Sequence, residues 1–89
     1  MDKNKVILGS LAMDLKRAAL GYYGKSTKMA GVFLGEAMKR KKEIDLVAVK
    51  PYIKNLLDKL DNIKMEKNKR KAAEDILMYS ILFQNAALN

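Results

Sequence analysis

The nine residues ALGYYGKST, from Ala19 to Thr27, fit the loose form of a phosphate-binding loop, a small residue and four others before Gly-Lys-Ser/Thr. In such a loop a buried strand ends in a glycine turn, and the amides that begin the next helix hold the phosphates together with the lysine. Here the preceding segment has the periodicity of an amphipathic helix, and two bulky tyrosines occupy the loop. We therefore expect no nucleotide hydrolysis. Gly24 is predicted to end one helix, and Ser26 or Thr27 to cap the next.

Acid–base chemistry near neutral pH would depend on the ten carboxylates, because the chain has no His and no Cys. Glu74 and Asp75 are adjacent, so on a helix they point about 100° apart and do not face one another as a catalytic pair does. We expect them to favour the positive end of their helix. Asp58 and Asp61 share a helix face, but Lys54 offers Asp58 an ordinary surface partner. The sequence thus predicts no enzyme, no metal site and no cofactor.

Length and composition predict one ordered domain covering residues 1–89. Hydrophobic residues make up 49% of the chain and charged residues 31%, with a single proline. The formal net charge of +8 favours an anionic partner, either nucleic acid or an acidic protein. The longest apolar tract, residues 76–88, is shorter than the roughly 20 residues that span a bilayer, and the basic start lacks a cleavage site. We expect a cytoplasmic protein with no membrane partner and no small-molecule substrate.

The spacing of apolar residues predicts an all-α chain of four helices. The first covers roughly residues 3–22, the second runs from Ser26 or Thr27 into the basic run 39–42, the third follows Pro51 to Ile63, and the fourth covers about 68–87. The segment between Lys42 and Pro51 is predicted either to be extended or to prolong the second helix. Short connections favour an antiparallel up-down four-helix bundle.

Each predicted helix has an expected inner face. In the first helix Ser10, Asp14 and Arg17 are expected on the opposite, outer side. The expected inner residues are Leu8, Leu11, Leu15, Ala18 and Tyr22 of the first helix; Met29 or Ala30, Phe33 and Ala37 of the second; Tyr52 or Ile53, Leu56, Leu57, Leu60 and Ile63 of the third; and Ala72, Ala73, Ile76, Leu77, Ser80, Phe83 and Ala87 of the fourth.

The fourth helix has more apolar residues than one inner face requires. Its segment ILMYSILF contains only Ser80 as a frankly polar residue, so Met78, Ile81 and Leu82 must point away from the main seam. Either this helix is central, or these three residues contact another subunit. A chain of this length leaves little interior to enclose them, so we predict a homo-oligomer.

Gly31 and Gly35 have the G-x-x-x-G spacing that lets helices approach closely. Such a pattern marks a membrane dimer only in a long apolar segment, which this is not. We expect both glycines to let a bulky neighbour or another helix pack closely, because glycine inside a helix costs on the order of 1 kcal/mol relative to alanine.

Two basic runs differ in where they fall. The run 39–42 closes a helix, where cations complement the dipole, but the run 67–71 begins one, where cations oppose it. In an up-down bundle the second run shares an end with the turn that follows the first helix. Free helix amino termini, cations and aromatic rings there would suit a phosphate backbone, although lysine-rich turns also merely keep small proteins soluble. The candidate nucleic-acid residues are Tyr22, Tyr23, Lys25, Lys28, Lys67, Lys69, Arg70 and Lys71.

In size, four-helix pattern and basic charge, the chain resembles the ribosomal-RNA intervening-sequence proteins and the accessory variability proteins of diversity-generating retroelements. The resemblance implies an oligomeric barrel with a basic surface, and retroelement accessories bind a reverse transcriptase and nucleic acid. This chain is shorter, and no functional residue carries over. The sequence predicts a non-enzymatic oligomeric helical adaptor that contacts nucleic acid non-specifically through its basic end. The alternative is a purely protein-binding or structural module without nucleic-acid binding.

Overall fold

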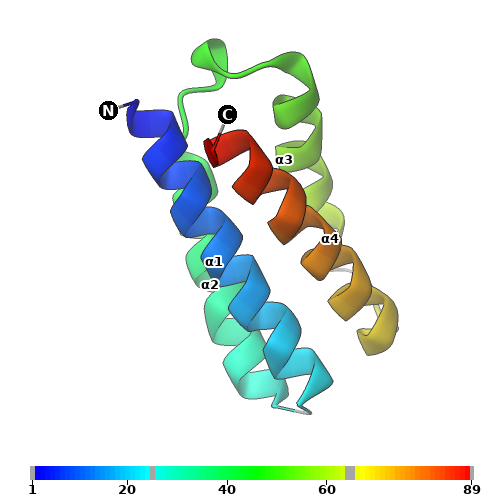
Figure 1. The fold of residues 1–89 in the computed structure, drawn as a ribbon. Coiled ribbons are helices and arrows are strands. Elements are labelled where there is room, and N and C mark those ends of the chain that lie inside the picture. The colour runs from blue at the N-terminus through cyan, green and yellow to red at the C-terminus, as the bar shows by residue number, and fades with distance from the viewer. Residues whose placement is uncertain (1, 25, 64–65, 89) are drawn as a thin grey trace.

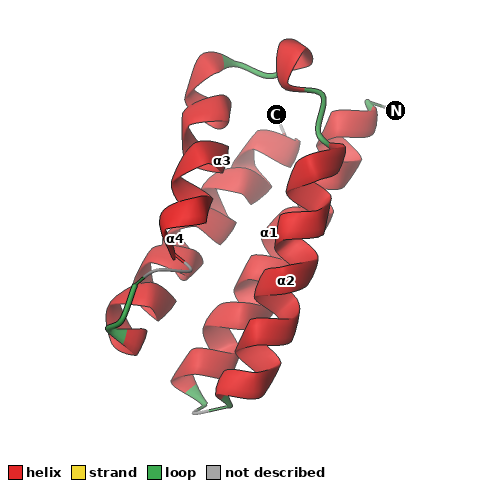
Figure 2. Ribbon diagram, turned by 180° about the vertical axis from the view of Figure 1, so that it is seen from behind, coloured by secondary structure: helices red, strands yellow, loops and turns green. Residues whose placement is uncertain are grey.

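The fold is all-helical. A computed structural model describes residues 2–24, 26–63 and 66–88, and it contains four α-helices, one short 3-10 helix and no strand within those ranges (Figure 1, Figure 2). The elements are α1 (Lys3–Tyr23), α2 (Thr27–Glu43), the 3-10 helix η1 (Leu46–Ala48), α3 (Pro51–Ile63) and α4 (Lys69–Leu88).

The turn between α1 and α2 has the predicted boundary residues. The backbone N–H of Gly24 donates to the carbonyl of Leu20 at 2.9 Å, which ends α1. The Ser26 hydroxyl accepts from the N–H of Met29 at 3.4 Å, which satisfies one of the free amides that begin α2. The prediction that Gly24 ends the first helix is confirmed, and of the two residues predicted to cap the next helix, Ser26 is the cap.

The connector between α2 and α3 was predicted either to be extended or to prolong α2. Both alternatives are wrong, because the connector contains a separate 3-10 helix. α2 ends at Glu43, and η1 follows after Ile44 and Asp45, with the Asp45 side chain accepting from the N–H of Val47 at 3.1 Å. The side chain of Asn4 donates to the Asp45 carbonyl and accepts from the Asp45 N–H, both at 3.0 Å. This pair of hydrogen bonds fixes the connector to the first turn of α1.

Helix α1 is the most extensively packed element. It lies against both α2 and α4, and α4 also packs against α3. Figure 1 and Figure 2 show both chain termini at one end of the molecule, and the α1–α2 turn and the α3–α4 connection at the other. Ten residues of α1 are buried, against five in α4. The core thus forms around α1 and not around α4.

The inner faces of α1, α3 and α4 agree with the periodicity. Tyr22, Leu56, Leu77 and Ala87 are half-buried, and Tyr52 is exposed. The fully or nearly fully buried residues among those expected are Leu8, Leu11, Leu15, Ala18, Ile53, Leu57, Leu60, Ile63, Ala72, Ala73, Ile76, Ser80 and Phe83.

Two expectations about the inner faces are wrong. Asp14, expected on the outer side of α1, is only 5% exposed because it lies between α1 and α2. In α2 the buried residues are Ala30, Leu34, Ala37 and Met38, while Phe33 is only half-buried. The expected inner face of α2 is therefore correct at Ala30 and Ala37 and wrong at Phe33, where Leu34 takes the inner position.

The glycines mark where helices approach and where they do not. A Cβ on Gly21 would lie 2.8 Å from the backbone nitrogen of Ala30, so α1 and α2 meet there with no room for a side chain. A Cβ on Gly31 or Gly35 would meet no atom within 4 Å. The expectation that a neighbour packs closely on Gly31 and Gly35 is therefore wrong within the described part of the chain.

Alanine substitution should separate these two situations. Gly31→Ala and Gly35→Ala should each raise the free energy of unfolding by roughly 0.5–1 kcal/mol, because alanine loses less backbone entropy in a helix and meets no obstacle. Gly21→Ala should lower it by about 1–3 kcal/mol, because the new methyl group must push α1 and α2 apart. Urea denaturation measures all three. A loss of stability in Gly31→Ala equal to that in Gly21→Ala would contradict this packing.

Candidate functional site

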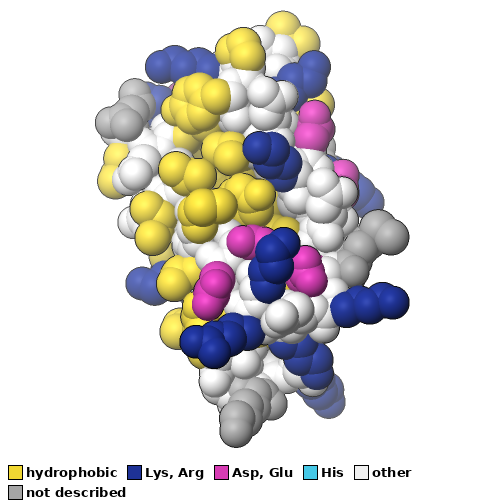
Figure 3. Space-filling view, turned by 90° about the vertical axis from the view of Figure 1, so that its right-hand side faces the viewer, with side chains coloured by type: hydrophobic (Ala, Val, Ile, Leu, Met, Phe, Trp, Pro, Cys, Tyr) yellow, Lys and Arg dark blue, Asp and Glu magenta, His cyan; other side chains and the backbone are white. Residues whose placement is uncertain are grey.

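The outer side of α4 exposes large apolar side chains. Met78 is 48% exposed, Ile81 53% and Leu82 37%, because α4 turns Ile76, Ser80 and Phe83 toward the core on its opposite side. We call Met78, Ile81 and Leu82 the α4 apolar face. Figure 3 shows a band of hydrophobic side chains on the side of the molecule formed by α3 and α4. Leu88, near the end of α4 and 76% exposed, was not singled out in the sequence.

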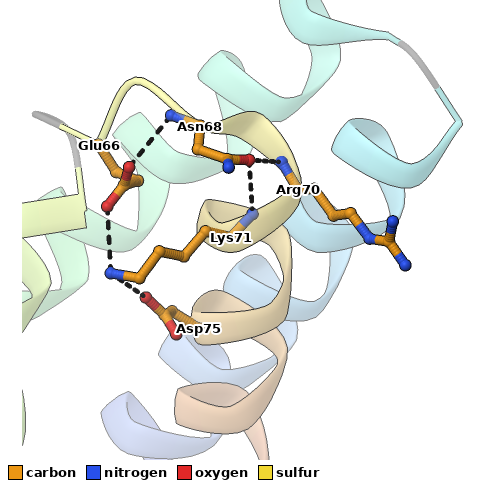
Figure 4. Close-up of polar contacts among 5 residues, drawn as sticks. All are labelled: Glu66, Asn68, Arg70, Lys71 and Asp75. Atoms are coloured by element: carbon orange, nitrogen blue, oxygen red, sulfur yellow. Dashed lines mark hydrogen bonds and ion pairs between the residues drawn. The ribbon is translucent and has the colours of Figure 1, made fainter.

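The first turn of α4 is organised by a cap that precedes it. The side-chain oxygen of Asn68 accepts from the backbone N–H groups of Arg70 at 3.1 Å and Lys71 at 3.2 Å, and Glu66 accepts from the N–H of Asn68 at 3.1 Å (Figure 4). Three backbone amides around the start of the helix thus have acceptors. An Asn at this position stabilises a helix start by about 1 kcal/mol relative to Ala.

Acidic residues neutralise part of the basic run 67–71. The Lys71 ammonium lies 3.2 Å from the Glu66 carboxylate and 3.9 Å from that of Asp75 (Figure 4). The Arg70 guanidinium lies 3.6 Å from the Glu74 carboxylate. The expectation that Glu74 and Asp75 act on the positive end of α4 is wrong, since the first turn holds no acidic residue. They lie one turn later, where they pair with the cations.

This pairing shifts both ionisation equilibria in the expected directions. The pKa of Glu66 is lowered from its usual 4.5, first by the hydrogen bond from the Asn68 backbone and then by the hydrogen bond from Lys71. The pKa of Lys71 is raised above its usual 10.5, mainly by its hydrogen bond to Glu66. Each charged form therefore stabilises the other across the α3–α4 connection.

The remaining candidate nucleic-acid residues are less restrained. Tyr22 is half-buried against the core, while Tyr23 is 49% exposed. Lys28, Lys67 and Lys69 are exposed, and none of them forms an ion pair with any described residue. Lys25 lies outside the described residues. The two connections that carry these residues lie at one end of the molecule in Figure 1 and Figure 2.

A second polar cluster was missed in the sequence. The buried Asp14 lies 3.4 Å from a terminal guanidinium nitrogen of Arg17 and 3.5 Å from Nε of Arg40, so it joins α1 to α2. The guanidinium of Arg17 lies over the Phe33 ring, 5.6 Å from its centre. The three-residue spacing of Asp14 and Arg17 could have predicted their ion pair from the sequence. The pair between Asp14 and Arg40 could not be predicted, because it depends on how α2 packs against α1.

The carboxylates of α3 have a different partner from the one expected. Asp61 accepts from Lys41 of α2 at 2.7 Å, and no ion pair joins Lys54 to Asp58 among the described residues. Within the same described ranges, no group of three or more acidic side chains is placed to hold a metal ion. No helix there combines the length and apolar character that a bilayer crossing requires.

No protein-family model matches the sequence, and neither a curated protein nor a solved structure matches it.

The Glu66–Lys71 pair predicts a pH dependence. Because the folded pKa of Glu66 is lowered, its contribution to stability is present above pH 4.5 and is lost as the pH falls through the folded value. The raised pKa of Lys71 gives a contribution to stability that is present below pH 10.5 and lost as the pH rises through its folded value.

Carbon-detected NMR titration of the native protein should show the Glu66 carboxyl titrating below pH 4.5. In Lys71→Met its midpoint should move upward, and an unchanged midpoint would contradict the pairing.

Proposed function

We propose that this chain is an antiparallel up-down four-helix bundle that acts as a non-enzymatic oligomeric adaptor. The observation that supports this proposal is the exposure of Met78, Ile81 and Leu82 on one side of a single helix. Single exposed apolar residues are ordinary, but a contiguous apolar patch marks an interaction surface. Burial contributes roughly 25 cal/mol for each Å² of apolar surface removed from water, so contact between copies at this face is favourable.

Substitution on the α4 apolar face tests the oligomer. Ile81→Lys should reduce the mass measured by multi-angle light scattering to that of the 10.1 kDa chain, because the ammonium would have to be desolvated at the interface. Val47→Lys is the matched control, since Val47 is 94% exposed on η1 and outside this face. It should leave the mass unchanged.

The same mass for the native protein and Ile81→Lys would show that the interface lies elsewhere. Dissociation by Val47→Lys alone would place it at η1 and contradict the proposal.

Non-specific nucleic-acid contact is the second candidate function. It is favoured by the exposed Lys28, Lys67 and Lys69, which form no ion pair with an acidic residue in the described chain. The exposed ring of Tyr23, close to Lys28 in the sequence, adds a surface on which a base could stack. Arg70 and Lys71 add less, because Glu74, Glu66 and Asp75 already offset their charges. The alternative function is a protein-binding module whose positive charge serves solubility.

A salt series with labelled single-stranded RNA and DNA separates these two functions. Affinity should fall steeply with salt, and Lys67→Glu/Lys69→Glu should weaken binding and reduce the slope by roughly 1–2, since each lost phosphate contact removes about 0.7–0.9 from it. The matched control is Lys50→Glu/Lys54→Glu, which changes the net charge by the same amount at the start of α3, away from the α3–α4 connection. This control should weaken binding less. Absence of binding at low salt, or equal losses in both variants, would leave the protein-binding module as the function.

A further inference from the structure

A groove of about 360 Å³ lies between α1 and α2, on a part of the molecule separate from the α4 apolar face. Its polar walls are Ser10, Asp14 and Arg17 of α1 and Arg40 of α2, and Gly9 contributes no side chain. Ser10 is half-buried in this groove, and Arg17 and Arg40 flank it.

Two of the three arginines in the chain converge on this groove, although 18 residues are Lys or Arg. Arginine differs from lysine in its planar fork of five N–H donors, which suits anions that accept several hydrogen bonds at once. Most positive charges of the chain are lysines, whereas the two side chains at this groove are arginines, whose N–H groups can donate several hydrogen bonds to one anion.

One carboxylate does not saturate these two guanidinium groups. Both contacts to Asp14, at 3.4 and 3.5 Å, are longer than the 2.7–2.9 Å or so of a strong charge-assisted hydrogen bond. Oδ2 of Asp14 lies 3.5 Å from Nε of Arg40 without a hydrogen bond, so the Arg40 guanidinium donates no hydrogen bond to this carboxylate. The side chains of Arg17 and Arg40 are 50% and 43% exposed, and the only hydrogen bond from either guanidinium among the described residues runs from Arg17 to Asp14.

The charge of the cluster is unbalanced in favour of an anion. Two guanidinium charges meet a single buried carboxylate, and Glu36, the acidic residue one turn before Arg40 on α2, is bound to Lys39 at 3.3 Å. The Phe33 ring beneath Arg17 restricts that guanidinium through a cation–π contact. Asp14 and Phe33 thus orient the donors before any ligand arrives, which lowers the entropy cost of binding.

We propose that Arg17 and Arg40 form a binding site for a phosphate group, with Asp14 as the residue that positions them and Ser10 as an additional hydroxyl donor. The phosphate can be inorganic phosphate or the phosphodiester of a nucleic acid, which share the chemistry that the two guanidinium groups recognise. The site does not depend on oligomerisation through α4, nor on the lysines at the α1–α2 turn.

Titration of the native protein with sodium phosphate at constant ionic strength tests the site, with sodium chloride as the reference. The Nε–Hε NMR signals of Arg17 and Arg40 should shift and saturate, and that of Arg70 should not. In Arg17→Lys/Arg40→Lys, which keeps the charge but removes both forks, phosphate affinity should fall at least about tenfold. Arg70→Lys is the matched control and should bind as the native protein does.

A short oligonucleotide without terminal phosphates distinguishes the two sources. If it displaces inorganic phosphate from Arg17 and Arg40, the ligand is a nucleic-acid phosphodiester, and if it does not, the ligand is free phosphate. The proposal is overturned if the Arg17 and Arg40 signals do not saturate, or if Arg17→Lys/Arg40→Lys binds phosphate as tightly as Arg70→Lys. Because the native signals report directly on the site, this test stands even where the double variant does not fold.

Discussion

The structure depends on the close packing of α1 against its two neighbours. Gly21 meets the backbone of Ala30, and Gly9 approaches Ala87 of α4, where a Cβ would lie 3.8 Å from the alanine methyl group. Ala18 and Ala19 are fully buried. Small residues at these positions let α2 and α4 lie near the α1 backbone, where the larger Leu11 and Leu15 fill the interior. Most other features follow from α1 being the central helix.

A core centred on α1 has a direct consequence for α4. Helix α4 packs against α1 and α3, and the part of its surface that faces them carries Ile76 and Phe83. On the other side of α4, Met78 and Ile81 remain about half exposed in the described part of the chain, so the apolar surplus of this helix contacts solvent. Contact between copies at this surface would add buried apolar area, which the small interior of an 89-residue chain provides only in limited amount.

The periodicity of apolar residues was enough to predict the four helices and most of the core, because burial of Leu11, Leu57 or Phe83 follows from helical spacing alone. It did not determine how α2 is rotated, because Phe33 and Leu34 are both apolar and only packing against α1 selects Leu34. Nor could it reveal contacts that join separate elements. The burial of Asp14 depends on Arg40 from another helix, and the neutralisation of Lys71 depends on where the preceding connection places Glu66.

The central proposal is that copies of the chain associate through the α4 apolar face, which is exposed in the structure. Sedimentation equilibrium of the native protein over a wide concentration range tests it most directly. The claim predicts a mass that is a multiple of 10.1 kDa and that falls toward 10.1 kDa on dilution. A mass of 10.1 kDa at every concentration would contradict it.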